Sequence, residues 1–203
     1  MNDSTHAVSV SLTSVRTAAW LRNGSIVLAG TLFVALCARV SLPLSFTPVP
    51  LTLQPFAVLL LGILLTPRLA GATLVTYLLE GAAGLPVFAP GVAGVSGLAH
   101  LLGPTGGYLL AYPIAAYAIA ALWRGSSRSM TWALLSVSAG DAILLGMGAL
   151  WLGIYTHASL AIVLSQAVVP FLPGDALKVA AAAVLGFQWL RLRRNGGPSH
   201  PTV

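Results

Sequence analysis

Two ionisable residues, Asp175 and Lys178, stand three positions apart near the end of the chain, in the segment FLPGDALKVAAA. On a helix, residues at this spacing share one face, so the carboxylate and the ammonium group would point the same way. Ionisable side chains are costly in apolar sequence and are usually retained for function. Two interpretations remain open: a neutralising ion pair, or a pair that grips a ligand with a hydrogen-bond donor and an anionic end.

Two further carboxylates fall inside or beside apolar runs. Glu80 lies about one turn before Pro86, and it would either pair with Arg39 or line the same site as Asp175. Asp141 lies near the middle of a long apolar run beside Gly140, where we expect it to be a hydrogen-bonding group between helices. A catalytic pair of carboxylates should meet in one cavity, so these two positions argue against an intramembrane enzyme.

Other chemical motifs are weak. His100 and His157 have no neighbours at metal-ligand spacing, so we expect no metal site and treat both as interfacial or structural. The segment Thr105-Gly106-Gly107-Tyr108 lacks the lysine and the strand context of a phosphate loop. Its glycines are expected to permit close helix packing instead. The sequence therefore predicts no catalytic residues, no cofactor and no ATP hydrolysis by this chain itself.

The composition shows which elements must position these residues. The chain has 203 residues, of which 57% are hydrophobic and only 7% are charged, and its mean hydropathy is +0.91. A soluble domain carries roughly a quarter charged residues, so the solvent for most of this chain must be lipid. The net charge of +6 comes from arginines at chain ends and between apolar runs, where membrane orientation accounts for it without a nucleic-acid partner.

Apolar runs predict an all-α integral membrane protein, a single bundle of six transmembrane helices with long apolar external loops. A short helix is expected within 157–173, where Pro170 and Pro173 interrupt the apolar sequence. The whole chain, 1–203, is expected to form one transmembrane domain with polar tails at 1–22 and 195–203. The expected spans are 24–41, 52–66, 68–85, 106–123, 130–155 and 174–192.

Arginines predict the orientation of these spans. They occur before the first span, between the second and third, between the fourth and fifth, and after the sixth, and only Arg39 breaks this pattern. Both termini are therefore expected to face the cytoplasm. The other connections, 42–52, 86–105 and 156–173, are apolar, rich in proline and glycine and almost uncharged. Irregular backbone of this kind persists at membrane depth where it is buried or lines a cavity. The external ends of the helices are therefore expected to close over a ligand site.

Four segments in and beside the predicted external connections carry a family resemblance. FTPVPLTLQPF (46–56), LLEGAAGLPVFAPG (78–91), LLGPTGGYLLAYP (101–113) and FLPGDALKVAAA (171–182) resemble the BioY family, the biotin-specific substrate-binding (S) components of energy-coupling factor (ECF) transporters. The resemblance covers residues 24–194. It implies six helices in one membrane domain, with biotin held near the external face beneath the first long loop.

The resemblance also implies site residues. The PGDxxK motif falls on Asp175 and Lys178, the loop motif ending in TLQ places a glutamine near the site at Gln54, and the third-span position near the ring system falls on Glu80. Asp175 would accept from the ureido N–H groups of biotin, Gln54 or a backbone amide would serve its carbonyl, and Lys178 would meet its carboxylate. An apolar cavity with a few directed polar groups suits such a ligand.

Partners follow from the same resemblance. S components dock on a transmembrane coupling (T) protein, which works with ABC-type ATPases, through small residues spaced four apart on the first helix. The nearest candidates are Thr31 with Ala35 and Ser25 with Ala29. The implied function is biotin uptake across the cytoplasmic membrane. The alternative within transport is a stand-alone biotin carrier that needs no coupling module.

Overall fold

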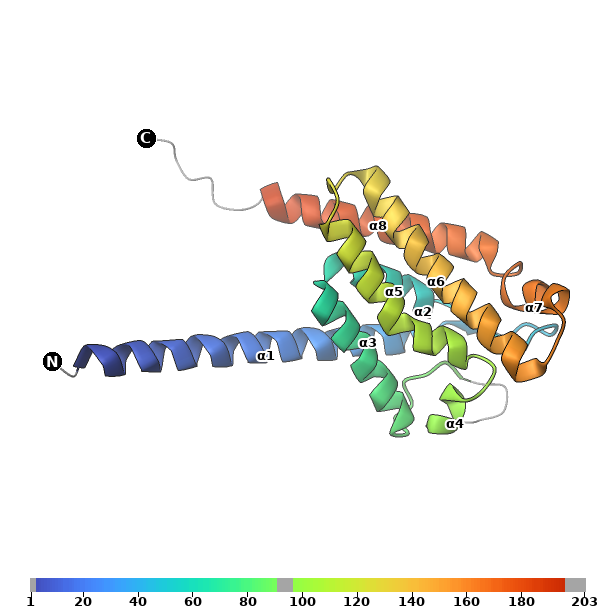
Figure 1. Ribbon diagram of the computed structural model, residues 1–203, viewed down its shortest axis with the longest axis horizontal. Helices are drawn as coiled ribbons and strands as arrows, with labels where there is room; N and C mark the ends of the chain where they lie inside the picture. The colour runs from blue at the N-terminus through green and yellow to red at the C-terminus, as the bar shows by residue number, and fades with distance from the viewer. Residues whose placement is uncertain (1–2, 91–96, 196–203) are drawn as a thin grey trace.

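The computed structural model describes residues 3–90 and 97–195, with side chains described for 17–90 and 97–193. Each of the six predicted apolar runs contains a helix, and the short helix expected within 157–173 is α7 (Figure 1). The tail expected at 1–22 is instead largely helical. In chain order the elements are α1 (Asp3–Arg39), β1 (Ser41–Leu42), β2 (Leu51–Thr52), α2 (Gln54–Leu64), α3 (Pro67–Ala82), α4 (Leu98–Leu101), α5 (Gly106–Arg124), α6 (Met130–Thr156), α7 (Leu160–Ala167) and α8 (Leu172–Asn195).

Membrane-spanning capacity is uneven among these helices. Within the described residues, three segments are long and apolar enough to cross a bilayer alone: Thr17–Arg39, α5 and α6. A fourth candidate consists of α7 and α8 together, with a bend of 50° at the break between them. The helix α2 has 11 residues, which span only about 16 Å against a hydrocarbon core of about 30 Å. The six-span count is therefore not confirmed, although the helices themselves lie where they were expected.

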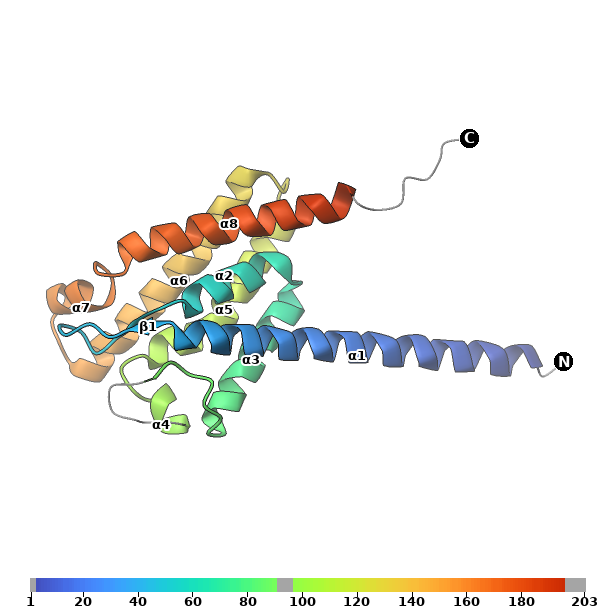
Figure 2. The ribbon, with the colours of Figure 1, turned by 180° about the vertical axis from the view of Figure 1, so that it is seen from behind.

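The short helix α2 is central to the bundle. It packs against α1, α3, α5, α6 and α8, and in Figure 2 it lies between α1 and α8 with α5 and α6 behind. Its side chains Val58, Leu59 and Ile63 are fully buried. A helix enclosed on all sides by other helices need not match the thickness of the bilayer, which explains how so short an element fits. Lipid-facing positions on the outer helices instead carry exposed apolar side chains, such as Leu32, Leu36 and Leu185.

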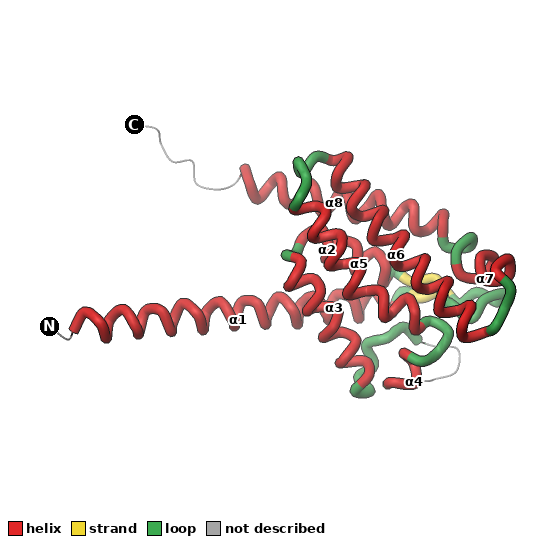
Figure 3. Tube along the Cα trace, in the orientation of Figure 1, coloured by secondary structure: helices red, strands yellow, loops and turns green. Residues whose placement is uncertain are grey.

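The bundle has two distinct ends. The antiparallel hairpin of β1 and β2 lies at one end with α4 and α7, and we call this the hairpin end (Figure 3). The opposite end contains the α2–α3 connection, the α5–α6 connection and the end of α8. We call it the basic end because it carries Arg68, Arg124, Arg128, Arg191 and Arg193. The N-terminal half of α1 extends away from the bundle beyond this end.

Glycines bring α5 and α6 together near the hairpin end. A Cβ atom at Gly107 would collide with the Met147 carbonyl oxygen and with the side chain of Trp151, both on α6. On α6, a Cβ atom at Gly148 would meet the ring of Tyr108 in the same way. The expectation that Gly106-Gly107 serves close helix packing is confirmed, and the contact fixes how the α5 and α6 side chains face each other.

Candidate ligand-binding site

A cavity of about 860 Å³ lies at the hairpin end. The hairpin loop 43–50, the start of α2, α4 with the segment leading to α5, and the facing sides of α5, α6 and α8 all contribute to its wall. Ligand pockets in proteins commonly measure about 300–1,000 Å³ and are mostly apolar with a few directed polar groups. The sequence expectation that the non-basic ends of the helices close over a site therefore corresponds to an observed cavity.

Asp175 and Lys178 lie together in this wall, on the first two turns of α8. The Lys178 Nζ atom donates to Asp175 Oδ1 at 2.9 Å, and the two side chains are only 8% and 6% exposed. The helix begins two residues earlier than expected, at Leu172, and the Asp175 N–H donates to the Phe171 carbonyl oxygen at 2.8 Å. The pair is thus both an ion pair and part of the cavity surface, so the two interpretations of the sequence are compatible.

Gln54 is held rigidly at the first position of α2. It is 3% exposed and lines the cavity. Its Nε2 atom donates to the Tyr77 hydroxyl at 2.7 Å, and its Oε1 atom accepts from Thr52 Oγ1 at 3.3 Å. The Tyr77 hydroxyl in turn donates to the Val87 carbonyl oxygen at 2.9 Å. The amide of Gln54 is thus held from both its nitrogen and its oxygen while the residue contributes to the cavity wall.

Glu80 lies elsewhere. It is not in the described lining of the cavity, and in the described residues no ion pair joins it to Arg39. Its Oε1 atom accepts from Thr31 Oγ1 at 3.2 Å, which links α3 to α1. Its neighbour one turn earlier, Tyr77, faces the Gln54 network instead. The structure therefore brings together three of the four predicted site residues and places Glu80 at a helix–helix contact.

Asp141 is a cavity residue that the sequence reasoning assigned to a structural role. It lines the cavity from α6 and makes no hydrogen bond or ion pair to the described residues. Leu144, three positions later, lines the same wall, so the helical spacing of the two is consistent with one face. That spacing was visible in the sequence, but which face of an all-apolar helix points inward was not.

Aromatic side chains form much of the remaining wall. Tyr108 and Tyr112, one turn apart on α5, line it together with Phe171, and the Tyr108 and Phe171 ring centroids lie 6.2 Å apart. His100 lines the cavity and stacks on Phe88 at 5.1 Å. His157 is exposed and ends α6. No group of metal-binding side chains occurs among the described residues.

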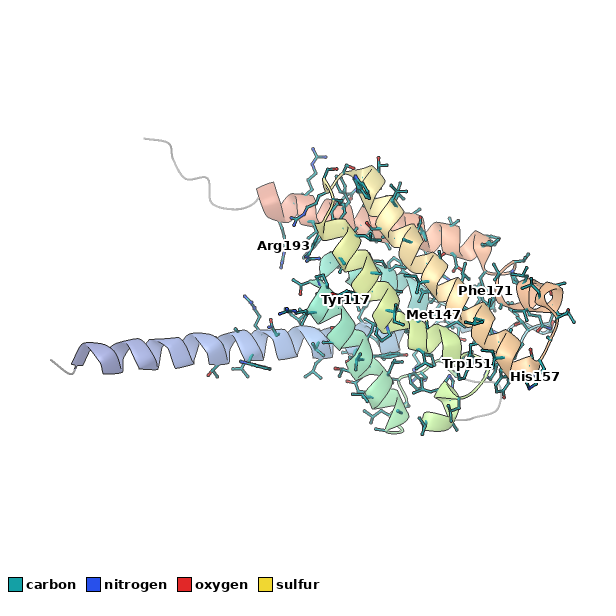
Figure 4. The ribbon with its side chains drawn as sticks, in the orientation of Figure 1. Tyr117, Met147, Trp151, His157, Phe171 and Arg193 are labelled. Carbon is teal, nitrogen blue, oxygen red and sulfur yellow. The ribbon has the colours of Figure 1, made fainter. Side chains whose placement is uncertain are left out.

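The hairpin loop covers the cavity from one side. Thr47 Oγ1 donates to the Gln166 carbonyl oxygen of α7 at 2.9 Å. Val49 is buried in a small cluster with Leu152 and Val163. The loop carries Pro43, Pro48 and Pro50, which stiffen it. Figure 4 shows Phe171 and His157 at this end of the bundle and Arg193 at the other.

The sequence profile of the BioY family matches residues 7–195. This chain belongs to the BioY family. It is 41% identical over 155 residues to the "Probable biotin transporter BioY" of Pyrococcus horikoshii, covering 76% of this chain and 89% of that protein. It is 37% identical over 164 residues to the "Biotin transporter BioY" of Thermotoga maritima, covering 81% and 91%.

A solved structure has the same fold. It is described as the S component for biotin from an ECF-type ABC transporter, and it matches with a TM-score of 0.76 at 26% identity, covering 89% of this chain and 95% of that one. The BioY resemblance stated from four sequence motifs is therefore confirmed, and this BioY-family chain is a membrane protein with the fold of an S component.

Proposed function

We propose that this chain is the biotin-binding S component of an ECF transporter and serves biotin uptake across the cytoplasmic membrane. The observation that carries the proposal is the buried Asp175–Lys178 pair in the wall of an aromatic-lined cavity. Family membership and the biotin transporters among the relatives support the choice of ligand.

The cavity contains a candidate partner for each polar group of biotin. Asp175 accepts from the ureido N–H groups, the unused N–H of Gln54 donates to the ureido carbonyl, and Lys178 meets the valerate carboxylate. The rings of Tyr108, Tyr112 and Phe171 cover the apolar thiophane ring and chain. Glu80 takes no part in this assignment, because its carboxylate is occupied by Thr31.

We further propose that the chain docks on a T component driven by ABC-type ATPases, with both termini in the cytoplasm. Of the two small-residue pairs on α1, Thr31 is buried against α3, whereas Ser25 and Ala29 are exposed. The exposed pair is therefore the better docking surface. The alternative is a stand-alone carrier, and full-rate biotin uptake in a host without coupling proteins would favour it.

The binding proposal is tested with two ligands that differ at one end. Lys178 is the single lysine of the chain. Lys178→Ala should weaken biotin by at least about tenfold, since a hydrogen bond to a charged group contributes roughly 1.5–3 kcal/mol. Biotinamide lacks the anionic end and should be weakened far less. Asp175→Asn should weaken both ligands alike, because both keep the ureido ring.

Isothermal titration of the purified chain measures these affinities. Arg68→Ala, which removes a positive charge at the basic end, is the matched control and should leave both affinities unchanged. Equal losses of biotin and biotinamide in Lys178→Ala would show that the lysine does not contact the carboxylate. Failure of the unaltered chain to bind biotin would overturn the proposal as a whole.

A further inference from the structure

A second cavity, of about 370 Å³, lies at the basic end. It is formed by the last residues of α5, the α5–α6 connection and the last turns of α8. Four arginines line it: Arg124, Arg128, Arg191 and Arg193. The rest of the lining is apolar and consists of Trp123, Phe187 and Leu190. It lies at the opposite end of the bundle from the hairpin-end cavity and shares no lining residue with it.

No carboxylate neutralises this cluster within the described residues. The lining contains none. Asp141 and Asp175 lie in the cavity at the hairpin end, and Glu80 is bonded to Thr31. Neither Arg128 nor Arg191 makes a side-chain hydrogen bond or ion pair to another described residue. Like charges gathered without a counter-charge repel one another, so a bound anion would be favoured here.

The backbone of one residue in the cavity wall, Arg128, has an unusual conformation. Arg128 has φ 55°, in the left-handed region that is uncommon for residues other than glycine. Its N–H donates to Ser126 Oγ at 3.2 Å, which helps to hold the turn. Glycine would adopt this conformation without strain. An arginine at this position makes a functional role for its side chain a hypothesis to test.

The surroundings of the cavity are typical of the surface of a bilayer. Exposed tryptophans, Trp132 on the first turn of α6 and Trp189 on α8, lie at the same end, as is typical of the level of lipid headgroups. The Arg193 guanidinium lies 5.3 Å from the centroid of the Trp189 ring. Exposed apolar side chains, Leu122 and Leu185 among them, continue from this level along α5 and α8.

We propose that the cavity at the basic end binds the headgroup of an anionic phospholipid. The phosphate oxygens accept from Arg128, Arg191 and Arg193, for which the planar guanidinium is well suited. The acyl chains run along the apolar outer faces of α5 and α8. Arg124 has a positioning part, because its Nη1 atom donates to the Leu65 carbonyl oxygen at the end of α2. The proposal does not depend on the identity of the transported ligand.

The test is lipid binding to the purified full chain in neutral detergent, followed by native mass spectrometry. Phosphatidylglycerol should bind at least about tenfold more tightly than phosphatidylcholine with the same acyl chains. The double substitution Arg128→Gln/Arg191→Gln should remove most of this preference. The control is Arg22→Gln/Arg68→Gln, which also removes two positive charges, but from exposed positions outside the cavity. This control should keep the preference.

Two further arms separate the alternatives. Arg128→Gly removes the side chain while relieving the backbone, so it should weaken phosphatidylglycerol without lowering thermal stability. Soluble glycerophosphoglycerol, the same headgroup without acyl chains, should bind far more weakly than the lipid. Equal losses in the cavity and control pairs, no preference in the unaltered chain, or equally tight binding of the soluble headgroup would each overturn the lipid proposal.

Discussion

The hairpin end and the basic end of the bundle each enclose a cavity with charged residues in its wall, but they treat those charges differently. At the hairpin end, Lys178 is paired with Asp175 at 2.9 Å. Gln54 is hydrogen-bonded through both its amide nitrogen and its amide oxygen. At the basic end, four arginines face one cavity with no described carboxylate. At the hairpin end Asp175 and Lys178 balance each other, although Asp141 in the same wall has no partner among the described residues. The basic end is open to an external anion.

The difference follows from burial: Asp175 and Lys178 are buried, whereas Arg128, Arg191 and Arg193 are exposed. A charge buried among apolar helices must be paired, because desolvation costs several kcal/mol per ion. A charge at the membrane surface remains hydrated, and it has lipid phosphates nearby. Asp175, Lys178 and Gln54 are therefore held in a pair and a network at the hairpin end, while the basic end needs only positive charge on flexible side chains.

The comparison predicts that the two ends face opposite sides of the membrane, and labelling of introduced cysteines tests this most directly. In a Cys37→Ala background, a cysteine introduced by Ser45→Cys in the hairpin loop should react with a membrane-impermeant maleimide in intact cells. A cysteine introduced by Ser127→Cys in the α5–α6 connection should not, although both positions are exposed. The expected contrast is all or none, and the reverse pattern would overturn the orientation.

Charge removal should affect stability very differently at the two ends. Lys178→Met leaves the Asp175 carboxylate buried and unpaired, which should lower the free energy of unfolding by about 3 kcal/mol. Arg191→Gln relieves repulsion at an exposed position and should change it by no more than about 0.5 kcal/mol. Denaturant unfolding of both variants in detergent, without ligand, measures the difference.

The control for this contrast is the double substitution Asp175→Asn/Lys178→Met. Removing both charges should recover much of the stability lost in Lys178→Met alone, because no buried charge is then left unpaired. Equal effects of Lys178→Met and Arg191→Gln would mean that the pair at the hairpin end is as well hydrated as the arginines, and the comparison would fail.

The smallest expected effect concerns the cover of the hairpin end. Thr47→Val removes the hydroxyl that bonds the Gln166 carbonyl oxygen, a contribution of about 1 kcal/mol. If the loop is a lid over bound biotin, dissociation of biotin should become roughly fivefold faster. Ser45→Ala, a hydroxyl deletion in the same loop at an exposed position, should leave the rate unchanged. Equal rates in all three proteins would show that this bond does not restrain the lid.

The sequence alone determined the helices and one part of the site. Lipid solvation requires the backbone to bond internally, so apolar runs bounded by proline, glycine and arginine predict helices well. Asp175 and Lys178 are neighbours by local spacing, and no other element is needed to bring them together. The family motifs supplied Gln54. The count of spans was less secure, because α2 has only 11 residues and α3 only 16, too few for a clear length signal.

Contacts between distant segments were decided only by the tertiary structure. Helices that are apolar on all sides give little sign of which face points inward, since the contrast between polar and apolar faces is weak. Asp141 therefore lines a cavity where an interhelical bond was expected, and Glu80 bonds to Thr31 on α1. The cavity at the basic end joins α5 to α8 across a long stretch of sequence. Close packing at glycines such as Gly107 sets the rotation of each helix, and that rotation is a property of helix pairs rather than of local sequence.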